Sequence, residues 1–457
     1  MSQTLFRGAR LVDPVAGTDS RDELLSLRVR SGRIAEIAAD LAPDAGDEVL
    51  EARGAVLTVA GFDPHVHFRE PGHSHKETLE TGAAAAAAGG FSDVAVMPNT
   101  EPPLDEAHRV RGVGERAHAI GLVRMHVVAA CTLGLRGDRL TEFVALAEAG
   151  AIGFSDDGRP VEDALRMRRA LEWGRTVDRV IVTHAELPAL RGKGVMHEGA
   201  VSGRLGYPGI AAACESGAVA RDLELAALTG ARLHVAHVSS ERGVEMVRDA
   251  KRRGVTVTAE TAPHYLHFTD EAVARKGTAA KMNPPLRTAA DRAALRAALA
   301  EGTIDCLATD HAPHAVYEKE APFEEAPFGV VGLETAWAAA LTALHHEEGL
   351  PLLAVVRLLT TAPRRVFGLP IGGLEVGSPA DLVLLDAGAE WSVEPGAFHT
   401  KGRHTPFAGE TLRGRILGTW VAGRRTFERR FEEVADGASP GRTRHALLSV
   451  AAPGGVR

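Results

Sequence analysis

The chain has 457 residues, a formal net charge of −8 at pH 7 and a sequence pI near 6.2. No run of Lys or Arg offers a stripe for a nucleic-acid backbone, and no stretch approaches the ~20 apolar residues of a membrane span. These features argue against nucleic-acid and membrane partners. Because the first residues also lack a signal-peptide pattern, we expect a cytoplasmic protein. The three cysteines are far apart in the sequence, which argues against a disulfide framework.

Both ends of the chain have the pattern of β-strands. Segments 25–30 and 33–37 alternate polar and apolar residues, and the pair Ser31 and Gly32 between them predicts a hairpin turn. Segments 380–386 and 415–421 predict further strands near the other end. We therefore expect residues 1–55 and 373–457 to fold together as one small sheet domain. Residues from about 436 onward lack a clear period, which predicts fraying.

Between the two ends, apolar strand-like runs alternate with longer helical patterns, which is typical of repeated β-α units. The strand-like runs are 56–67, 92–98, 124–130, 151–157, 179–186, 232–239, 255–264 and 304–311. The helical patterns include 78–88, 105–119, 161–174, 241–253 and 289–300. Eight parallel strands with crossover helices predict an α/β protein with a (β/α)8 TIM barrel over residues 56–372. In such barrels the active site lies at the carboxyl ends of the strands.

The first barrel strand ends in the segment 61–72, which reads Gly-Phe-Asp-Pro-His-Val-His-Phe-Arg-Glu-Pro-Gly. His65 and His67 are two positions apart, so in a strand both side chains point to one face and can bind a single metal ion. This spacing alone also fits two unrelated polar histidines. Arg69 is one further step of two along the chain, where its guanidinium could bind a carboxylate or a phosphate through two hydrogen bonds.

Polar side chains follow most of the other predicted strands. They are Asn99 after the second strand, Asp156 and Asp157 at the end of the fourth, His184 in the fifth, His237 in the sixth, and Asp310 with the following His314 at the eighth. Any one of them could be a cap or a satisfied polar residue. Together they predict a nitrogen and oxygen site at the barrel mouth. Such a site suits Zn²⁺, with room for one or two ions.

Seven motifs then connect the chain to a known family. They are 63–72, Met97-Pro-Asn-Thr100, Phe154-Ser-Asp-Asp-Gly158, His234-Val-Ala-His-Val-Ser-Ser240, Glu260-Thr-Ala-Pro-His-Tyr-Leu266, Lys281-Met-Asn-Pro-Pro-Leu-Arg287 and Ala308-Thr-Asp-His-Ala-Pro-His314. Over nearly its whole length the chain resembles the amidohydrolase superfamily, and most of all the bacterial class I dihydroorotases. This resemblance implies a metal-dependent barrel with a composite β-sandwich domain built from both termini.

The resemblance also assigns roles to individual residues. It implies metal ligands at His65, His67, Asp157, His184, His237 and Asp310, with Asp310 as the proton shuttle, and substrate contacts at His67, Arg69, Asn99, Asn283, His314, Phe328 and Gly329. Many superfamily members bridge two metals with a carbamylated lysine on the fourth strand, but this strand ends without a lysine. We expect an aspartate bridge instead, and favour Asp157 over Asp156.

The reaction implied by the resemblance is the reversible cyclisation of N-carbamoyl-L-aspartate to L-dihydroorotate plus water, in pyrimidine biosynthesis. Alternatives are an allantoinase or hydantoinase, and a non-catalytic scaffold for aspartate carbamoyltransferase. A homodimer and an association with that transferase are further hypotheses. The long stretch between His314 and Gly329 is either a lid over the substrate or a passive surface loop. We expect His73 and His75 in a solvated loop and His264 in packing near the site.

Overall fold

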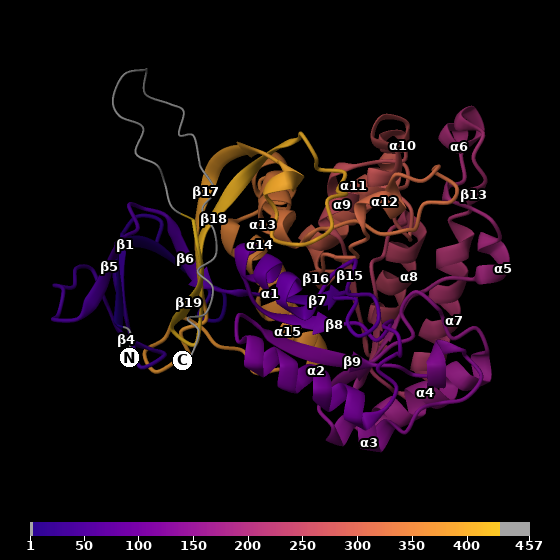
Figure 1. Ribbon diagram of the computed structural model, residues 1–457, viewed down its shortest axis with the longest axis horizontal. Coiled ribbons are helices and arrows are strands. Elements are labelled where there is room, and N and C mark those ends of the chain that lie inside the picture. The colour runs from indigo at the N-terminus through magenta and orange to yellow at the C-terminus, as the bar shows by residue number, and fades with distance from the viewer. Residues whose placement is uncertain (1–2, 430–457) are drawn as a thin grey trace.

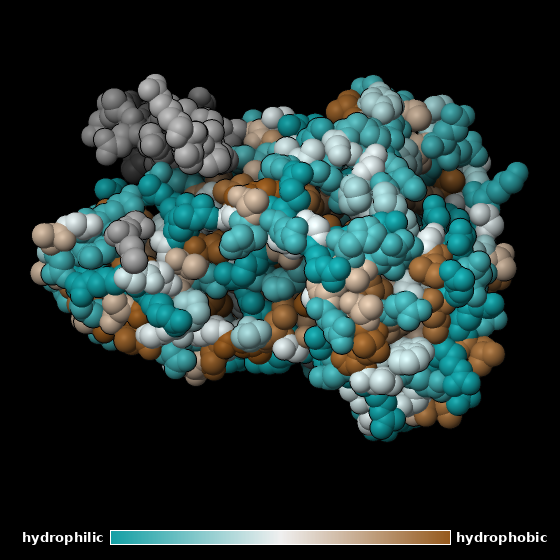
Figure 2. Space-filling model, turned by 60° about the horizontal axis from the view of Figure 1, so that its bottom comes forward, coloured by the Kyte–Doolittle hydropathy of each residue, from teal (hydrophilic) through white to brown (hydrophobic). Residues whose placement is uncertain are grey.

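The structure is a computed structural model, and it describes residues 3–429. A β-sheet built from both ends of the chain lies beside a barrel of strands and helices (Figure 1). The predicted fraying beyond residue 436 falls outside the described residues. No helix among the described residues is long and apolar enough to cross a membrane. Outside the grey atoms, the face in Figure 2 is largely hydrophilic, with hydrophobic residues interspersed.

Eight parallel strands form the barrel and follow one another in chain order. They are β7 (Gly61–Val66), β8 (Phe91–Val96), β9 (Arg124–Ala129), β10 (Ala151–Phe154), β11 (Val180–Thr183), β14 (Leu233–Val235), β15 (Val257–Thr261) and β16 (Cys306–Leu307). A parallel bridge between Val66 and His311, with a 2.9 Å hydrogen bond from His67 N to His311 O, joins the last segment to the first. The predicted (β/α)8 barrel is therefore confirmed.

Helices surround these strands (Figure 1). The longer ones are α1 (Leu79–Ala88), α2 (Ala107–Ile120), α4 (Ala164–Thr176), α7 (Ala213–Thr229), α8 (Glu241–Arg252), α11 (Ala289–Glu301), α14 (Leu352–Leu359) and α15 (Thr361–Phe367). The shorter ones are α3 (Phe143–Glu148), α5 (Pro188–Arg191), α6 (Ala200–Leu205), α9 (Pro263–His267), α10 (Glu271–Lys276), α12 (Val316–Lys319) and α13 (Ala336–Ala340). Single turns and a π-helix complete them: η1 (Leu133–Leu135), η2 (Gly277–Ala280), η3 (Leu333–Thr335), η4 (Leu341–Glu347) and η5 (Pro395–Ala397).

Local sequence explains where several helices begin. The side chains of Thr78, Ser240 and Thr288 each accept a hydrogen bond from the backbone N–H three residues ahead, and so cap α1, α8 and α11. Such caps satisfy N–H groups that the first turn leaves unpaired. The five predicted helical patterns correspond to α1, α2, α4, α8 and α11, within a few residues at each end.

A nine-stranded sheet joins the two ends of the chain. Its strands are β1 (Gln3–Asp13), β2 (Thr18–Asp19), β3 (Leu25–Arg30), β4 (Arg33–Ala38), β5 (Asp47–Glu51), β6 (Val56–Val59), β17 (Leu382–Ser392), β18 (Thr411–Val421) and β19 (Arg424–Glu428). A separate pair is β12 (Met196–His197) with β13 (Gly209–Ile210). The predicted hairpin is present, since β3 and β4 pair antiparallel across Ser31 and Gly32, both of which have positive φ.

One predicted strand is divided between the two sheets. Residues 56–67 were expected to form a single barrel strand, but β6 pairs with β1 and with β17 in the nine-stranded sheet, and only β7 enters the barrel. Both halves are buried and only Ala60 separates them, so the sequence pattern indicated one continuous strand. The domain limits at residues 55 and 372 stay predictions, and β6 lies on the barrel side of the first limit.

The sheet encloses its own core and is attached to the barrel. A register shift in β1 follows Phe6, and the Phe6 ring meets Trp420 edge-on at 4.8 Å, so the two halves of the sheet face each other across a buried cluster. This is the sandwich-like arrangement that was expected. Thr419 Oγ1 on β18 donates a 2.7 Å hydrogen bond to Ala87 O in α1, which connects the sheet to the barrel.

Candidate metal centre at the barrel mouth

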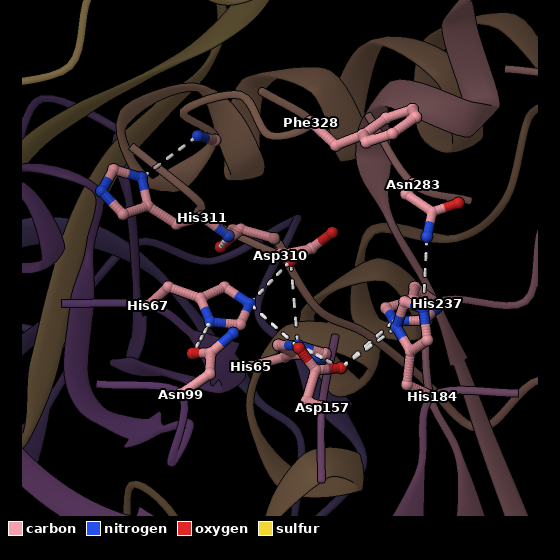
Figure 3. A network of polar contacts seen from close by, with 12 residues as sticks. His65, His67, Asn99, Asp157, His184, His237, Asn283, Asp310, His311 and Phe328 are labelled. Carbon is pink, nitrogen blue, oxygen red and sulfur yellow. Dashed lines mark hydrogen bonds and ion pairs between the residues drawn. The ribbon is translucent and has the colours of Figure 1, made fainter. Parts of the chain in front are cut away.

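The carboxyl end of β7 carries His65 and His67, and both side chains are buried. They face Asp157, which follows β10 (Figure 3). His65 Nε2 lies 3.4 Å from Asp157 Oδ1, and His67 Nε2 lies 3.4 Å from Asp157 Oδ2. Asp310, beyond β16, places Oδ1 3.1 Å from His67 Nε2 and 3.7 Å from His65 Nε2. Two histidines and two carboxylates thus form one group.

A second pair of histidines shares the same aspartate. His184 follows β11 and His237 follows β14, and their facing nitrogens, Nδ1 and Nε2, are 2.9 Å apart. Each of these nitrogens lies 3.4 Å from Asp157 Oδ1. Figure 3 shows Asp157 between the two histidine pairs. The structure therefore brings together all six residues that the resemblance assigned as metal ligands.

The geometry of these atoms fits a divalent metal. Ligands about 2.0–2.1 Å from a tetrahedral zinc ion lie roughly 3.3 Å from one another, close to the separations found here. His65 Nε2 and Asp157 Oδ1 are buried and have no hydrogen-bond partner among the described residues. Two sets, His65 with His67 and Asp310, and His65 with Asp157 and His237, each bring their ligand atoms within 4.8 Å of one another. Imidazole and carboxylate ligands suit Zn²⁺ and neighbouring divalent ions.

The electrostatics of the cluster also favour a cation. Burial acts to raise the pKa of Asp157, but the neighbouring His65, His184 and His237 outweigh burial and hold that pKa well below its usual range. Burial likewise opposes ionisation of Asp310, yet the contact with His67 keeps the pKa of this carboxyl below its ordinary value. Both carboxyl groups are therefore ionised and positioned to share positive charge.

Asp156 and Asp157 are adjacent in sequence but point to different places. Asp156 accepts hydrogen bonds from Cys131 N at 2.8 Å and Thr132 N at 3.0 Å, and from Thr132 Oγ1. Burial raises the pKa of Asp156 to about 6. Asp156 thus caps the backbone that follows β9, while Asp157 faces the histidines. This placement supports the preference for Asp157 as the bridging residue.

Three residues of this region have left-handed backbone conformations. The φ angles of Arg69, His237 and Asp310 are 59°, 36° and 47°. Residues other than glycine rarely adopt this region, because Cβ then approaches the carbonyl oxygen closely. Such strain persists only where the surrounding structure enforces it, and it is concentrated at functional sites.

A carboxylate beneath the cluster was not singled out from the sequence. Glu260 on β15 is fully buried, and it accepts hydrogen bonds from His65 Nδ1 at 2.8 Å and from His234 Nε2 at 3.0 Å. The bond to Nδ1 leaves His65 Nε2 free to face Asp157 and Asp310. On the opposite side, His67 Nδ1 donates to Asn99 Oδ1 at 2.7 Å. A charged residue inside an otherwise uncharged strand is the signal that could have identified Glu260.

Arg69 and His314 lie at the side of the cluster next to Asp310. Arg69 Nε donates to Pro313 O at 3.2 Å, and among the described residues the other guanidinium nitrogens have no hydrogen-bond partner. Burial lowers the pKa of Arg69 to about 10, so it stays charged near neutral pH. His314 Nε2 donates to Phe328 O at 2.8 Å. Two nitrogens of Arg69 are therefore available for an anion.

Lys76 adds a second cation that the sequence did not indicate. Lys76 Nζ lies 3.3 Å from His314 Nδ1 and forms a 3.0 Å ion pair with Glu318. Burial, followed by the charges of Arg69 and Lys76, lowers the pKa of His314 to about 2, so His314 is neutral. Of the nearby histidines, His75 is exposed and His73 is partly exposed, in the loop where they were expected.

Asn283 and Phe328 lie at another part of the rim (Figure 3). Asn283 Nδ2 donates to Glu186 Oε1 at 3.0 Å and lies 3.3 Å from His184 Nε2. His264 is buried and packs edge-on against Tyr265, with its Nε2 unpartnered among the described residues. Burial lowers the pKa of His264 to about 4. The structure brings all the predicted substrate-contacting residues to the rim, while their roles stay predictions.

Comparison with known proteins gives a consistent result. A family model described as "Dihydro-orotase-like" matches residues 54–243, and an "Amidohydrolase family" model matches residues 217–427. A curated dihydroorotase of Anaeromyxobacter dehalogenans is 47% identical, over 95% of this chain and 100% of the relative. A dihydroorotase of Syntrophus aciditrophicus is 44% identical, over 93% of this chain and 99% of the relative.

Solved structures with a similar fold carry a related name. The L-hydantoinase (dihydropyrimidinase) from Arthrobacter aurescens superimposes with a TM-score of 0.80 at 27% identity, over 93% of this chain and 96% of that structure. A D-hydantoinase from Thermus sp. has a TM-score of 0.76 at 23% identity, over 92% and 94% of the two chains. The second of these likenesses concerns the fold alone.

Proposed function

The chain belongs to the dihydroorotase family, and from this premise we propose that it catalyses the reversible cyclisation of N-carbamoyl-L-aspartate to L-dihydroorotate plus water, in de novo pyrimidine (UMP) biosynthesis. The observation that carries the proposal is the position of Arg69 beside the cluster of four histidines and two aspartates. A guanidinium with two unpartnered nitrogens suits the α-carboxylate of this substrate.

We propose Zn²⁺ as the cofactor, with one or two ions per subunit. His65, His67 and Asp310 would hold one ion, His184 and His237 a second, and Asp157 would contact both. When bound, zinc would supply a water whose pKa is lowered toward neutrality and would polarise a carbonyl oxygen. The residues fit such an ion because their facing nitrogen and oxygen atoms are buried and converge.

Asp310 is the group that holds and moves the proton. In hydrolysis, Asp310 accepts the proton of the attacking water at a carboxylate oxygen and then gives it to the ring nitrogen as the C–N bond breaks. In synthesis it takes a proton from the ureido nitrogen and returns it to the departing oxygen. The low pKa of Asp310 keeps the carboxylate ionised and ready to accept the proton.

Other side chains position the substrate. Arg69 and Asn99 bind the α-carboxylate, with His314 beside them, while Asn283 and the Phe328–Gly329 backbone face the pyrimidine ring. Asn99 is already fixed by its bond with His67, and Asn283 by its bond with Glu186. Because these partners are in place before the substrate binds, little conformational freedom is lost on binding.

The nearest alternative is a hydantoinase or allantoinase, which the structural likeness to the Arthrobacter aurescens enzyme favours. Their cyclic amide substrates lack the α-carboxylate, so Arg69 would have no anion to bind. A non-catalytic scaffold for aspartate carbamoyltransferase is disfavoured because a histidine or an aspartate is present at each of the six metal-ligand positions, and these side chains converge. Homodimer formation, association with the transferase and a cytoplasmic location stay predictions.

The test is turnover of L-dihydroorotate, hydantoin and allantoin by the zinc-loaded protein. Chromatography measures the N-carbamoyl-L-aspartate that forms from L-dihydroorotate. We expect turnover of L-dihydroorotate and a kcat/KM for it at least ~10⁴-fold above the other two substrates, since a site built for a charged group rejects analogues that lack it. Preferred turnover of hydantoin or allantoin would overturn the proposal. No turnover despite bound zinc would favour the scaffold.

A further inference from the structure

The loop between His314 and Gly329 contributes two residues of the proposed substrate site, Phe328 and Gly329. The sequence left two interpretations of this loop open, a lid that closes over the substrate and a passive surface loop. The contacts of the loop in the structure favour a third interpretation, a loop that is held in place. Two lysines, Lys281 before the loop and Lys319 within it, are 2% and 1% exposed, although lysine is rarely buried without a carboxylate partner.

The side-chain nitrogen of Lys319, the last residue of α12, is bonded only to main-chain oxygens among the described residues. Its ammonium donates to Gly329 O at 2.8 Å, Pro327 O at 3.0 Å and Lys281 O at 3.1 Å. These three bonds use all three N–H donors of a charged lysine. Neither Lys319 nor Lys281 forms an ion pair with a carboxylate among the described residues. The side-chain nitrogen of Lys319 therefore connects the end of the loop to the segment that leads to Asn283.

Lys281 makes the reciprocal connection. Its ammonium donates to Phe323 O and to Glu324 O in the middle of the loop. It also lies 5.1 Å from the ring centroid of Phe323 and 4.8 Å from that of Phe328, within the range of cation–π attraction. We call Lys281 and Lys319 the lysine clasp. Lys319 bonds the backbone of Lys281, and Lys281 bonds the loop a few residues beyond Lys319, so the middle and the end of the loop are attached to the segment at Lys281.

Further contacts place the loop against the site. Gly329 N donates to Lys281 O at 3.0 Å, and His314 Nε2 donates to Phe328 O at 2.8 Å. Gly329 has a φ of 131°, and a Cβ there would lie 2.6 Å from Ala312 O and 3.0 Å from His314 Nε2. The backbone at Gly329 is thus pressed against the residues that follow β16. Figure 3 shows Phe328 at the rim, in the same part of the view as Asn283.

We propose that Lys319 is a positioning residue that fixes loop 314–329, and with it the Phe328–Gly329 backbone, as a preformed wall of the substrate site. This inference rests on the proposed function, because it assumes that the wall faces the substrate ring. A wall formed before binding contacts the bound substrate and the transition state alike. Its loss should therefore raise KM while kcat changes little.

The first test is hydrogen exchange of the metal-free protein without substrate, which does not depend on any reaction. We expect amides in 314–329 to exchange slowly in the wild type. In Lys319→Met they should exchange at least ~10-fold faster, while peptides from the barrel strands are unchanged, as expected for local opening. Fast exchange of the loop in the wild type, or no change in the variant, would overturn the proposal.

The second test is steady-state kinetics of the zinc-loaded proteins. Lys319→Met should raise KM for L-dihydroorotate by about 10-fold with kcat within about 3-fold, because only uniform binding is lost. Lys319→Arg, which keeps the charge but not the three-donor geometry, should recover part of this loss. A fall in kcat with unchanged KM would contradict the positioning role. If Lys319→Met does not fold, the kinetics of Lys319→Arg and the exchange profile of the wild type test the positioning role instead.

Tyr317 provides the matched control. It lies on α12 two residues before Lys319, but it is 66% exposed. A preformed wall predicts that Tyr317→Ala leaves KM and loop exchange unchanged, whereas a lid that folds inward would use this side chain and lose affinity without it. If the wild type prefers hydantoin, the proposed function fails. The exchange result still stands in that case, and the KM comparison is made with hydantoin.

Discussion

The two sides of the barrel mouth are held in place by different means. On the metal side, the histidines and aspartates lie at or just beyond strand ends, and a neighbouring carboxylate or amide orients two of the histidines, as Glu260 does for His65 and Asn99 for His67. On the loop side, the wall at Phe328 and Gly329 depends on lysine ammonium groups bonded to main-chain oxygens.

This difference shows how the two tasks are separated. Metal ligands need fixed ring orientations, and a carboxylate behind an imidazole sets both its tautomer and its basicity. A substrate wall needs a fixed backbone, and an ammonium with three donors can hold several carbonyl groups without adding a negative charge beside an anionic substrate. The metal side should therefore control chemistry and metal affinity, and the loop side substrate affinity.

Asp310→Asn should have the largest effect, and it tests whether the metal side controls the chemical step rather than substrate affinity. We expect kcat to fall by roughly 10²–10⁴-fold, the usual range for loss of a general acid or base. KM for L-dihydroorotate should change little. The measurement is steady-state kinetics with zinc content determined in parallel, since Asp310 is also a proposed ligand. Full activity with bound zinc would show that another group moves the proton.

Arg69→Met tests whether a residue beside the metal cluster serves substrate binding rather than chemistry. Arg69 lies next to Asp310, but we assign it to the substrate. We expect kcat/KM for L-dihydroorotate to fall by about 10²–10³-fold, because a bidentate contact with a carboxylate is lost. Residual activity toward hydantoin should be unaffected. An equal loss for both substrates would instead place Arg69 in the chemistry that the metal side performs.

Glu260→Gln examines how the metal side is supported. Removing the negative charge behind His65 should weaken zinc binding by about 10–100-fold, the usual effect of losing such a partner. Competition with a chromogenic chelator measures the dissociation constant directly. Cys306→Ala is the control, since Cys306 lies beside Glu260 but makes no hydrogen bond with His65 among the described residues. Equal zinc affinity in Glu260→Gln and the wild type would show that Glu260 does not support metal binding through His65.

The smallest expected effect concerns pH and the loop side. Burial, followed by the nearby charge of Lys281, lowers the pKa of Lys319 from 10.5 to about 7. The unfolded chain then binds more protons than the folded one between pH 7 and about 10.5, so this residue makes stability rise with pH across that window. Lys281, His314, His404 and Glu320 are the titratable groups near it.

Lys319→Met should remove this contribution. We take the urea midpoint of the variant minus that of the wild type. We expect this difference to be more positive at pH 7 than at pH 9.5. The measurement is equilibrium unfolding of both proteins at the two pH values. A constant difference between the two midpoints would show that Lys319 stays charged across this range in the folded protein.

The two sides also differed in how far the sequence could predict them. His65 and His67 could be placed because an alternating spacing at a strand end determines direction, and Asp310 because barrel strands end at one face. Glu260 and Lys76 were missed. Their roles depend on contacts with residues distant in sequence: Glu260 contacts His65, 195 positions away, and Lys76 contacts His314, 238 positions away.

The lysine clasp could not be predicted for a similar reason. A lysine in a polar loop is ordinarily solvated, and only the folded backbone shows that Lys319 is enclosed by three carbonyl oxygens. The division of 56–67 between two sheets was missed because β6 and β7 are both buried and only Ala60 lies between them. Local pattern predicts element type well, whereas strand partners depend on the whole chain.

One measurement tests the separation of the two sides most directly. It is a crystal structure of the zinc-loaded protein with N-carbamoyl-L-aspartate, with an anomalous-difference map collected at the zinc edge. We predict anomalous density between Asp157 and the histidine pairs, the α-carboxylate on Arg69, and an unmoved loop at residues 314–329. Zinc elsewhere, or a substrate whose α-carboxylate does not contact Arg69, would contradict the account.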